Sequence, residues 1–121
     1  FGQTLLDTLA GAELERTSTL QNNLALVLKA LGDYQGAREL LEKAMRSDER
    51  HFGEEHPNTA VSYFNLGAVL QDLKDYAGAR NLYEKALRVF RHTLGEEHPY
   101  TKTAISRIKK LDQLEEGQGE D

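Results

Sequence analysis

With 121 residues, of which 39% are hydrophobic and 29% charged, the chain is long enough for one modest core and has the composition of an ordinary helical protein. It contains no cysteine, which excludes disulfides and thiolate metal sites and argues against a small secreted scaffold. A net charge of −5, without a basic stripe carrying interleaved aromatic residues, disfavours nucleic-acid binding.

The longest apolar run, Leu24–Leu28, is far shorter than the ~20 residues of a membrane span, and the chain shows no secretory signal. Together with the absence of cysteine, this points to a cytoplasmic protein without a membrane partner. Because the chain begins at Phe1 and not at methionine, we expect it to be part of a longer protein.

The first two predicted helices cover residues 17–31 and 34–51. In the first of them Leu20, Leu24, Leu28 and Leu31 recur at steps of four and three residues, which predicts that these leucines face the core. Before this hairpin, residues 1–10 align with residues 43–52, so we expect residues 1–16 to be the tail of a preceding repeat, with Leu5, Leu6 and Leu9 on a helix that ends at Gly11.

A second hairpin is predicted at 58–72 and 76–93, and a final helix at 100–114. Gly32–Asp33 and Lys74–Asp75 interrupt the apolar period and predict short connections, which make the joined helices antiparallel. Between the hairpins, Gly53 and Gly95 suit the end of a helix, and Pro57 and Pro99 suit the first turn of the next.

The end of the chain has a different character. Lys109 stands where the earlier copies have Gly67 and Ala25, which predicts that residues 101–114 form a capping helix whose outer side faces water. Residues 115–121 are acidic, contain glycine and lack apolar side chains, so we expect them to be disordered.

The strongest pattern is internal repetition. Residues 17–58 and 59–100 align without a gap, and 21 of the 42 positions are identical, including Gly-Glu-Glu-His-Pro at 53–57 and 95–99. A period of this length is typical of stacked supersecondary units, each of which buries its apolar face against a neighbour. Function is therefore expected on a repeated surface.

The signature residues at 65–67, 75–76, 79, 83 and 86–87 resemble the tetratricopeptide repeat (TPR), and the 42-residue period resembles the longer variant of kinesin light chains. The resemblance implies an all-α fold, in which antiparallel helix hairpins stack in a right-handed superhelix over residues 1–114. It also implies a concave groove, lined by the first helix of each repeat, that binds a peptide or a partner's helix. The chain is thus interpreted as an interaction module of a larger scaffold or adaptor protein.

Helical geometry places a candidate groove stripe opposite the leucines. The candidate binding residues are Asn22, Asn23, Leu26, Val61, Phe64, Asn65, Ala68, Gln71, Arg107 and Lys110. Among them Asn23, Asn65 and Arg107 form a ladder with one rung per repeat, suited to a peptide backbone and an acidic segment. Two alternatives stay open: Asn65 bonds the neighbouring repeat, and Phe64 is covered by the chain's own tail.

The sequence favours no enzymatic activity, cofactor or metal. It has no nucleotide-cradling glycine loop and no serine in a nucleophile elbow. His56 and His98 are interpreted as parts of helix starts, because stacked repeats hold successive loops about 10 Å or more apart, too far for one metal site. The alternative function is structural, namely homo-oligomers that form through exposed terminal repeat faces.

Overall fold

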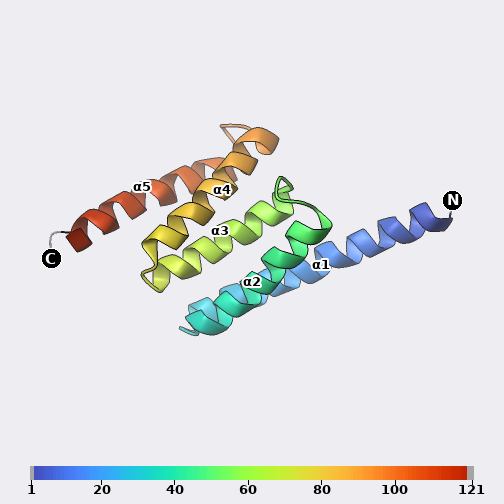
Figure 1. The fold of residues 1–121 in the computed structure, drawn as a ribbon, viewed down its shortest axis with the longest axis horizontal. Helices are drawn as coiled ribbons and strands as arrows, with labels where there is room; N and C mark the ends of the chain where they lie inside the picture. The colour runs from blue at the N-terminus through green and yellow to red at the C-terminus, as the bar shows by residue number, and fades with distance from the viewer. Residues whose placement is uncertain (1, 120–121) are drawn as a thin grey trace.

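Five α-helices connected by short turns make up the part of the chain that the structure describes (Figure 1). The computed structural model describes the backbone of residues 2–119 and the side chains of residue 5 and residues 8–117. The helices are α1 (Gly2–Ala30), α2 (Tyr34–His51), α3 (Pro57–Asp72), α4 (Tyr76–Leu94) and α5 (Pro99–Gly119).

Local chemistry explains where the helices begin. Asp33 caps α2 by accepting a hydrogen bond from the Gly36 N–H at 2.9 Å, and Asp75 caps α4 through Gly78 at 3.0 Å. The imidazole of His56 caps α3 by accepting from the Asn58 N–H at 3.0 Å. The His56–Pro57 pair thus starts α3, as expected from the sequence.

The helix ends depend on residues that tolerate the left-handed region. Gly53 and Gly95, which end α2 and α4, have φ angles of +89° and +93°. In the connection between α3 and α4, Lys74 takes up this conformation with a φ of +65°, at the position that Gly32 occupies in the first repeat.

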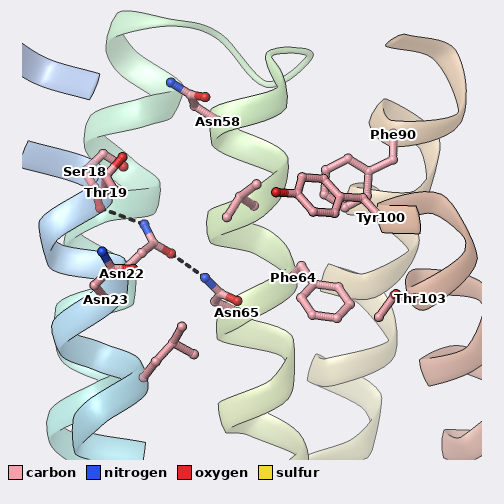
Figure 2. A pocket seen from close by; sticks show the side chains of 12 residues that line it. Ser18, Thr19, Asn22, Asn23, Asn58, Phe64, Asn65, Phe90, Tyr100 and Thr103 are labelled. Carbon is pink, nitrogen blue, oxygen red and sulfur yellow. Dashed lines mark hydrogen bonds between the residues drawn. The ribbon is translucent and has the colours of Figure 1, made fainter. Parts of the chain in front are cut away.

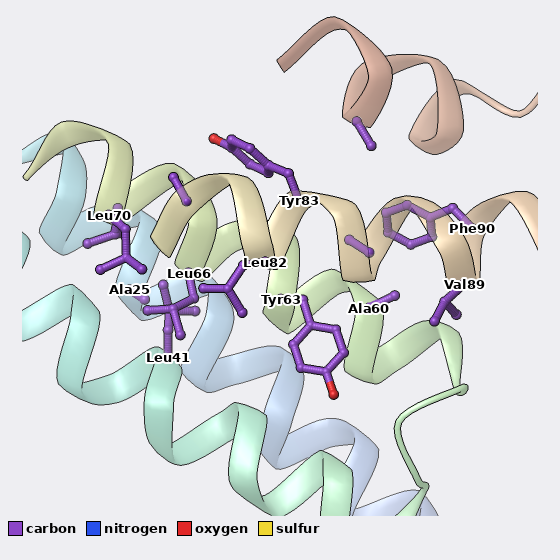
Figure 3. Packing of buried hydrophobic residues seen from close by; sticks show 14 of the residues in the cluster. Ala25, Leu41, Ala60, Tyr63, Leu66, Leu70, Leu82, Tyr83, Val89 and Phe90 are labelled. Atoms are coloured by element: carbon purple, nitrogen blue, oxygen red, sulfur yellow. The ribbon is translucent and has the colours of Figure 1, made fainter. Parts of the chain in front are cut away.

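The helices pack as two antiparallel hairpins, α1/α2 and α3/α4, with α5 against α4 (Figure 1). The two helices of the second hairpin lie close together at Gly67, where an added Cβ would lie 2.9 Å from the Tyr83 ring. The core gathers between these helices (Figure 3) and contains Leu41, Tyr63, Leu66, Val69, Leu82, Tyr83 and Phe90.

The structure corrects the expected start of the chain. No loop separates residues 1–10 from residues 17–31, because α1 is continuous through Gly11–Arg16. One glycine in a helix costs only about 1 kcal/mol relative to alanine, and the following Ala12 and Glu13 favour helix. Arg16 also pairs with Glu13 one turn earlier at 3.0 Å. The side chain of Leu6 lies outside the described residues, whereas Leu5 and Leu9 are exposed.

The predicted core face of α1 is also wrong. Leu20, Leu24 and Leu31 are 63%, 52% and 77% exposed, and Leu28 alone of the four leucines packs against the core. The buried face of α1 contains Ser18, Asn22 and Ala25 instead. At the repeat positions of Leu20 and Leu24, Ser62 bonds Asp48 of α2 and Leu66 lies in the core, whereas no helix within the described residues covers that side of α1.

The acidic end is more ordered than expected. Helix α5 continues to Gly119, while Glu120 and Asp121 lie outside the described residues. Arg80 on α4 holds this part of α5 through ion pairs with Asp112 and Glu115. Lys109 is exposed, in agreement with an outer side of α5 that faces water.

Deleting residues 116–121 is expected to leave the thermal midpoint nearly unchanged. The deletion preserves both ion pairs of Arg80, and the described side chains that it removes, Glu116 and Gly117, are exposed. Deleting residues 114–121 should lower the midpoint further, because it also removes Leu114, which packs against the core. Circular dichroism melts check both results, and equal midpoints for the two deletions would contradict this account of the helix end.

Candidate functional site: the concave groove

An open cavity of about 430 Å³ runs across the first helices of successive repeats. Polar residues of α1 and α3 form one wall, and aromatic residues of α3, α4 and α5 form the other (Figure 2). The lining residues are Ser18, Thr19, Asn22, Asn23, Leu26, Asn58, Val61, Phe64, Asn65, Phe90, Tyr100 and Thr103. This surface offers hydrogen bonds along one side and apolar contact along the other.

Six of the ten candidate residues line the cavity: Asn22, Asn23, Leu26, Val61, Phe64 and Asn65. The other four lie outside it. Ala68 is buried, and Gln71 accepts a hydrogen bond from the Tyr83 hydroxyl at 2.9 Å. Arg107 lies over the Phe64 ring, 5.9 Å from its centroid, and Lys110 is exposed.

Six lining residues are not among the ten candidates: Ser18, Thr19, Asn58, Phe90, Tyr100 and Thr103. Asn58 and Tyr100 occupy the same repeat position directly after the proline, so the period itself could have revealed them. Phe90 is a buried residue of α4, and its ring packs against Tyr100 with the ring centroids 5.4 Å apart.

The asparagine ladder is replaced by a different pairing. The Asn65 side-chain amide donates to the Asn22 oxygen at 2.8 Å, so its partner is Asn22 and not Asn23 (Figure 2). Asn22 is buried and in turn donates to the Ser62 hydroxyl at 3.1 Å. Of the two alternatives for Asn65, the structural bond to the neighbouring repeat is present, while Asn23 is exposed to solvent.

Beneath this pair lies a buried carboxylate. Asp48 is 1% exposed, and one of its oxygens, Oδ2, accepts hydrogen bonds from the hydroxyls of Ser18 at 2.9 Å and Ser62 at 2.7 Å. No hydrogen-bond partner within the described residues reaches the other oxygen, Oδ1. At the next junction of the repeat the equivalent residues are Ala60, Phe90 and Ala104, so the polar cluster belongs to the first junction alone.

Burial raises the pKa of Asp48, against the lowering effect of hydrogen bonds from Ser62 and Ser18 and of His56 and His51. A carboxyl whose pKa is higher in the folded state stabilises the fold below its unfolded pKa, and this stabilisation is lost as pH rises through the folded pKa. The ionised form of Asp48 therefore makes the folded state less stable at neutral pH.

Replacing Asp48 with asparagine should accordingly stabilise the protein more at pH 7 than near pH 4. The difference between wild type and variant isolates Asp48, because all other ionisable groups are the same in both proteins. Urea unfolding at several pH values measures it. A difference that stays constant with pH, or grows as pH falls, would show that burial does not raise the pKa of Asp48.

The aromatic wall is tightly supported. Phe64 packs against Tyr83 with ring centroids 5.3 Å apart, and the Arg107 guanidinium lies over the Phe64 ring. Burial raises the pKa of Tyr83 to about 12, so its hydroxyl stays protonated at neutral pH and can donate to Gln71. Phe64 is thereby held in place, half-buried, with part of its surface in the cavity.

Comparison with known families agrees with this arrangement. The model of the tetratricopeptide repeat matches residues 16–91 and 64–117, which together span most of the chain. The chain belongs to the tetratricopeptide repeat family. Its resemblance to this family, expected from the signature residues, is confirmed, and no curated protein matches the chain.

Among solved structures, this TPR chain is similar to the crystal structure of BtubC (BKLC) from P. vanneervenii. The TM-score is 0.76 at 21% sequence identity, which supports the all-helical superhelical fold of the TPR family. The match covers 81% of this chain and 39% of BtubC, so the TPR segment spans well under half the length of that neighbour.

Within the described residues, no cluster of three or more histidine, aspartate or glutamate side chains could hold a metal ion. None of the helices in the described part of the chain has the length and apolar character needed to cross a membrane.

Proposed function

We propose that the TPR segment is a protein-interaction module that binds an extended peptide in its concave groove, as part of a larger scaffold or adaptor protein. The observation that carries the proposal is the cavity across α1, α3 and α5, with asparagines on one wall and Phe64, Phe90 and Tyr100 on the other. Asparagine side chains match the donors and acceptors of a peptide backbone, and the aromatic wall suits an apolar side chain.

The ligand is further proposed to carry an acidic segment toward α5. Arg107 lies over the Phe64 ring at the edge of the groove, and a guanidinium can bind a carboxylate through two hydrogen bonds. Lys110, one turn further along α5, is exposed and adds a second positive charge. Lys102 contributes less, since it already pairs with Glu97 at 3.0 Å.

A random peptide library selected against the wild-type protein tests the proposal. Selected peptides should bind the wild type and lose most of their affinity for a variant with Phe64→Ala and Asn65→Ala. A matched control carries Leu87→Ala and Lys109→Ala, two changes outside the cavity, and should bind like the wild type. Failure to select any peptide that distinguishes the groove variant from this control would overturn the proposed function.

One observation supports the alternative function, self-association. Exposed apolar residues form a stripe on one face of α1 and directly after it, interrupted by the Glu13–Arg16 ion pair: Leu5, Leu9, Leu20, Leu24, Val27 and Leu31. The other end of the array, at α5, exposes Lys109, Lys110 and Gln113, so its described residues offer no matching apolar stripe for head-to-tail stacking. The occupant proposed for the stripe is therefore α1 of a second copy, related by two-fold symmetry.

Light scattering at increasing protein concentration tests this alternative. A dimer that becomes monomeric on Leu24→Glu, but not on Lys109→Glu, would support pairing through α1. A monomer at every concentration would contradict self-association and leave peptide binding in the groove as the proposed function.

A further inference from the structure

We propose that the groove selects a hydrogen-bond donor, an N–H group of its ligand, at the side-chain oxygen of Asn65, and that the buried Asp48–Ser62–Asn22 chain fixes this polarity. The inference rests on the proposed function, because it names the chemistry of a ligand in the same groove. It follows from the direction of each hydrogen bond beneath the groove floor.

The chain of bonds starts at Asp48. The hydroxyls of Ser18 and Ser62 both donate to the same oxygen of this carboxylate, at 2.9 and 2.7 Å. A serine hydroxyl has a single hydrogen. Once Ser62 has given its hydrogen to Asp48, its oxygen can only accept, and the group it accepts from is the Asn22 amide nitrogen at 3.1 Å.

The Asn22 amide transmits this direction. Its nitrogen donates both to Ser62 and to the backbone carbonyl of Ser18, the latter at 2.9 Å. Neither acceptor has a free hydrogen, so a reversed amide would bring oxygen against oxygen. The Asn22 oxygen must therefore face Asn65, and it accepts from the Asn65 amide nitrogen at 2.8 Å.

The last link fixes where the Asn65 oxygen lies, while the second hydrogen of the Asn65 amide nitrogen has no acceptor within the described residues. With the Asn65 nitrogen turned to Asn22, its oxygen points to the side of Phe64 (Figure 2), and no residue in the described part of the chain donates to it. A backbone N–H of an extended peptide is a donor of this kind, whereas an ester linkage has none. Asn65 thus requires a donor at the centre of the groove.

Asn23 provides the internal comparison. It occupies the same repeat position as Asn65 and lines the same cavity, but it is exposed and takes no part in the chain of bonds. Its amide can rotate to present either group. At the second junction Ala60, Phe90 and Ala104 replace the polar residues. The buried hydrogen bonds that fix the orientation of the Asn65 amide therefore have no counterpart at the second junction.

Hydrogen exchange of side-chain amides, followed by NMR, tests the chain of bonds without any ligand. Both Asn22 amide protons should exchange slowly in the wild type, and Ser62→Ala should make one of them exchange at least about tenfold faster. Ser18→Ala is the matched control, because it removes the other hydroxyl on Asp48 but keeps the carbonyl that holds Asn22. Fast exchange of the Asn22 amide protons in the wild type, or equal effects of the two variants, would contradict the proposed chain of hydrogen bonds.

An amide-to-ester scan of a peptide selected on the wild-type protein tests the ligand. One ester should weaken binding to the wild type by roughly tenfold, and this loss should disappear in Asn65→Ala but persist in Asn23→Ala. If no ester causes a loss of affinity that depends on Asn65, the proposal that Asn65 accepts a hydrogen bond from the ligand is contradicted. If no peptide binds at all, both the proposed function and the proposed ligand donor are contradicted. The hydrogen-exchange experiment still tests the directions of the buried hydrogen bonds, because it needs no ligand.

Discussion

Replacing Leu41 with alanine is expected to lower the free energy of unfolding by roughly 2 to 5 kcal/mol, as for other large-to-small changes in a close-packed core. Leu41 is fully buried with Ala25, Leu66 and Leu82 in the cluster between the helices (Figure 3). Leu20 is the matched control, because the same change there removes a side chain that is 63% exposed, and it should alter stability by less than roughly 0.5 kcal/mol.

Urea unfolding of the two variants tests whether Leu20 is exposed, as in the structure, or buried, as the apolar period of α1 predicts. The period by itself places Leu20 in the core, so it predicts comparable losses for the two leucines. A loss of more than about 1 kcal/mol for Leu20→Ala would mean that another surface covers α1 in solution, and a small loss for Leu41→Ala would contradict the packing of α2.

Reversing the charge of Arg107 is expected to weaken binding of an acidic peptide by roughly tenfold or more at low salt, because it replaces an attraction with a repulsion at the edge of the groove. Lys109→Glu makes the same change of charge at an exposed position outside the cavity, and should have a much smaller effect. The affinity for the wild type should fall as salt rises, since exposed charges are screened over ~8 to 10 Å at physiological ionic strength.

Fluorescence anisotropy with a selected acidic peptide and its glutamine-substituted version measures both effects. Thermal melts of the two variants control for the loss of the contact between Arg107 and Phe64. Equal effects of the two charge reversals, or an affinity that does not change with salt, would reduce the basic residues of α5 to a role in solubility.

The hairpins and their connections were predictable because their causes are local. Asp33, Asp75, Gly53 and Gly95 act on the backbone within a few residues, and the structure finds them at helix ends. The continuous α1 was not predictable in the same way, since alignment with the later repeats suggested a loop at Gly11–Arg16. That segment lacks the proline that begins α3 and α5, and it remains helical.

The site was harder to predict than the fold, because α1 has apolar residues on the side that faces solvent and polar residues on the side that is buried. Ser18 and Asn22 are buried since they bond Asp48 and Ser62, which lie on other helices. Such a network depends on long-range contacts that helical periodicity does not contain. Val61 and Phe64 line the cavity from α3 without such partners, on the stripe that the helical period predicts, and their role in binding stays a prediction.

The central claim is that the concave groove receives the ligand, and NMR titration of the labelled protein with a selected peptide tests it most directly. The account predicts shift changes at Asn23, Val61, Phe64, Asn65 and Thr103, with little change at Leu20, Leu24 and Val27 on the outer side of α1. Shift changes confined to the outer side of α1, or none at saturating peptide, would contradict it.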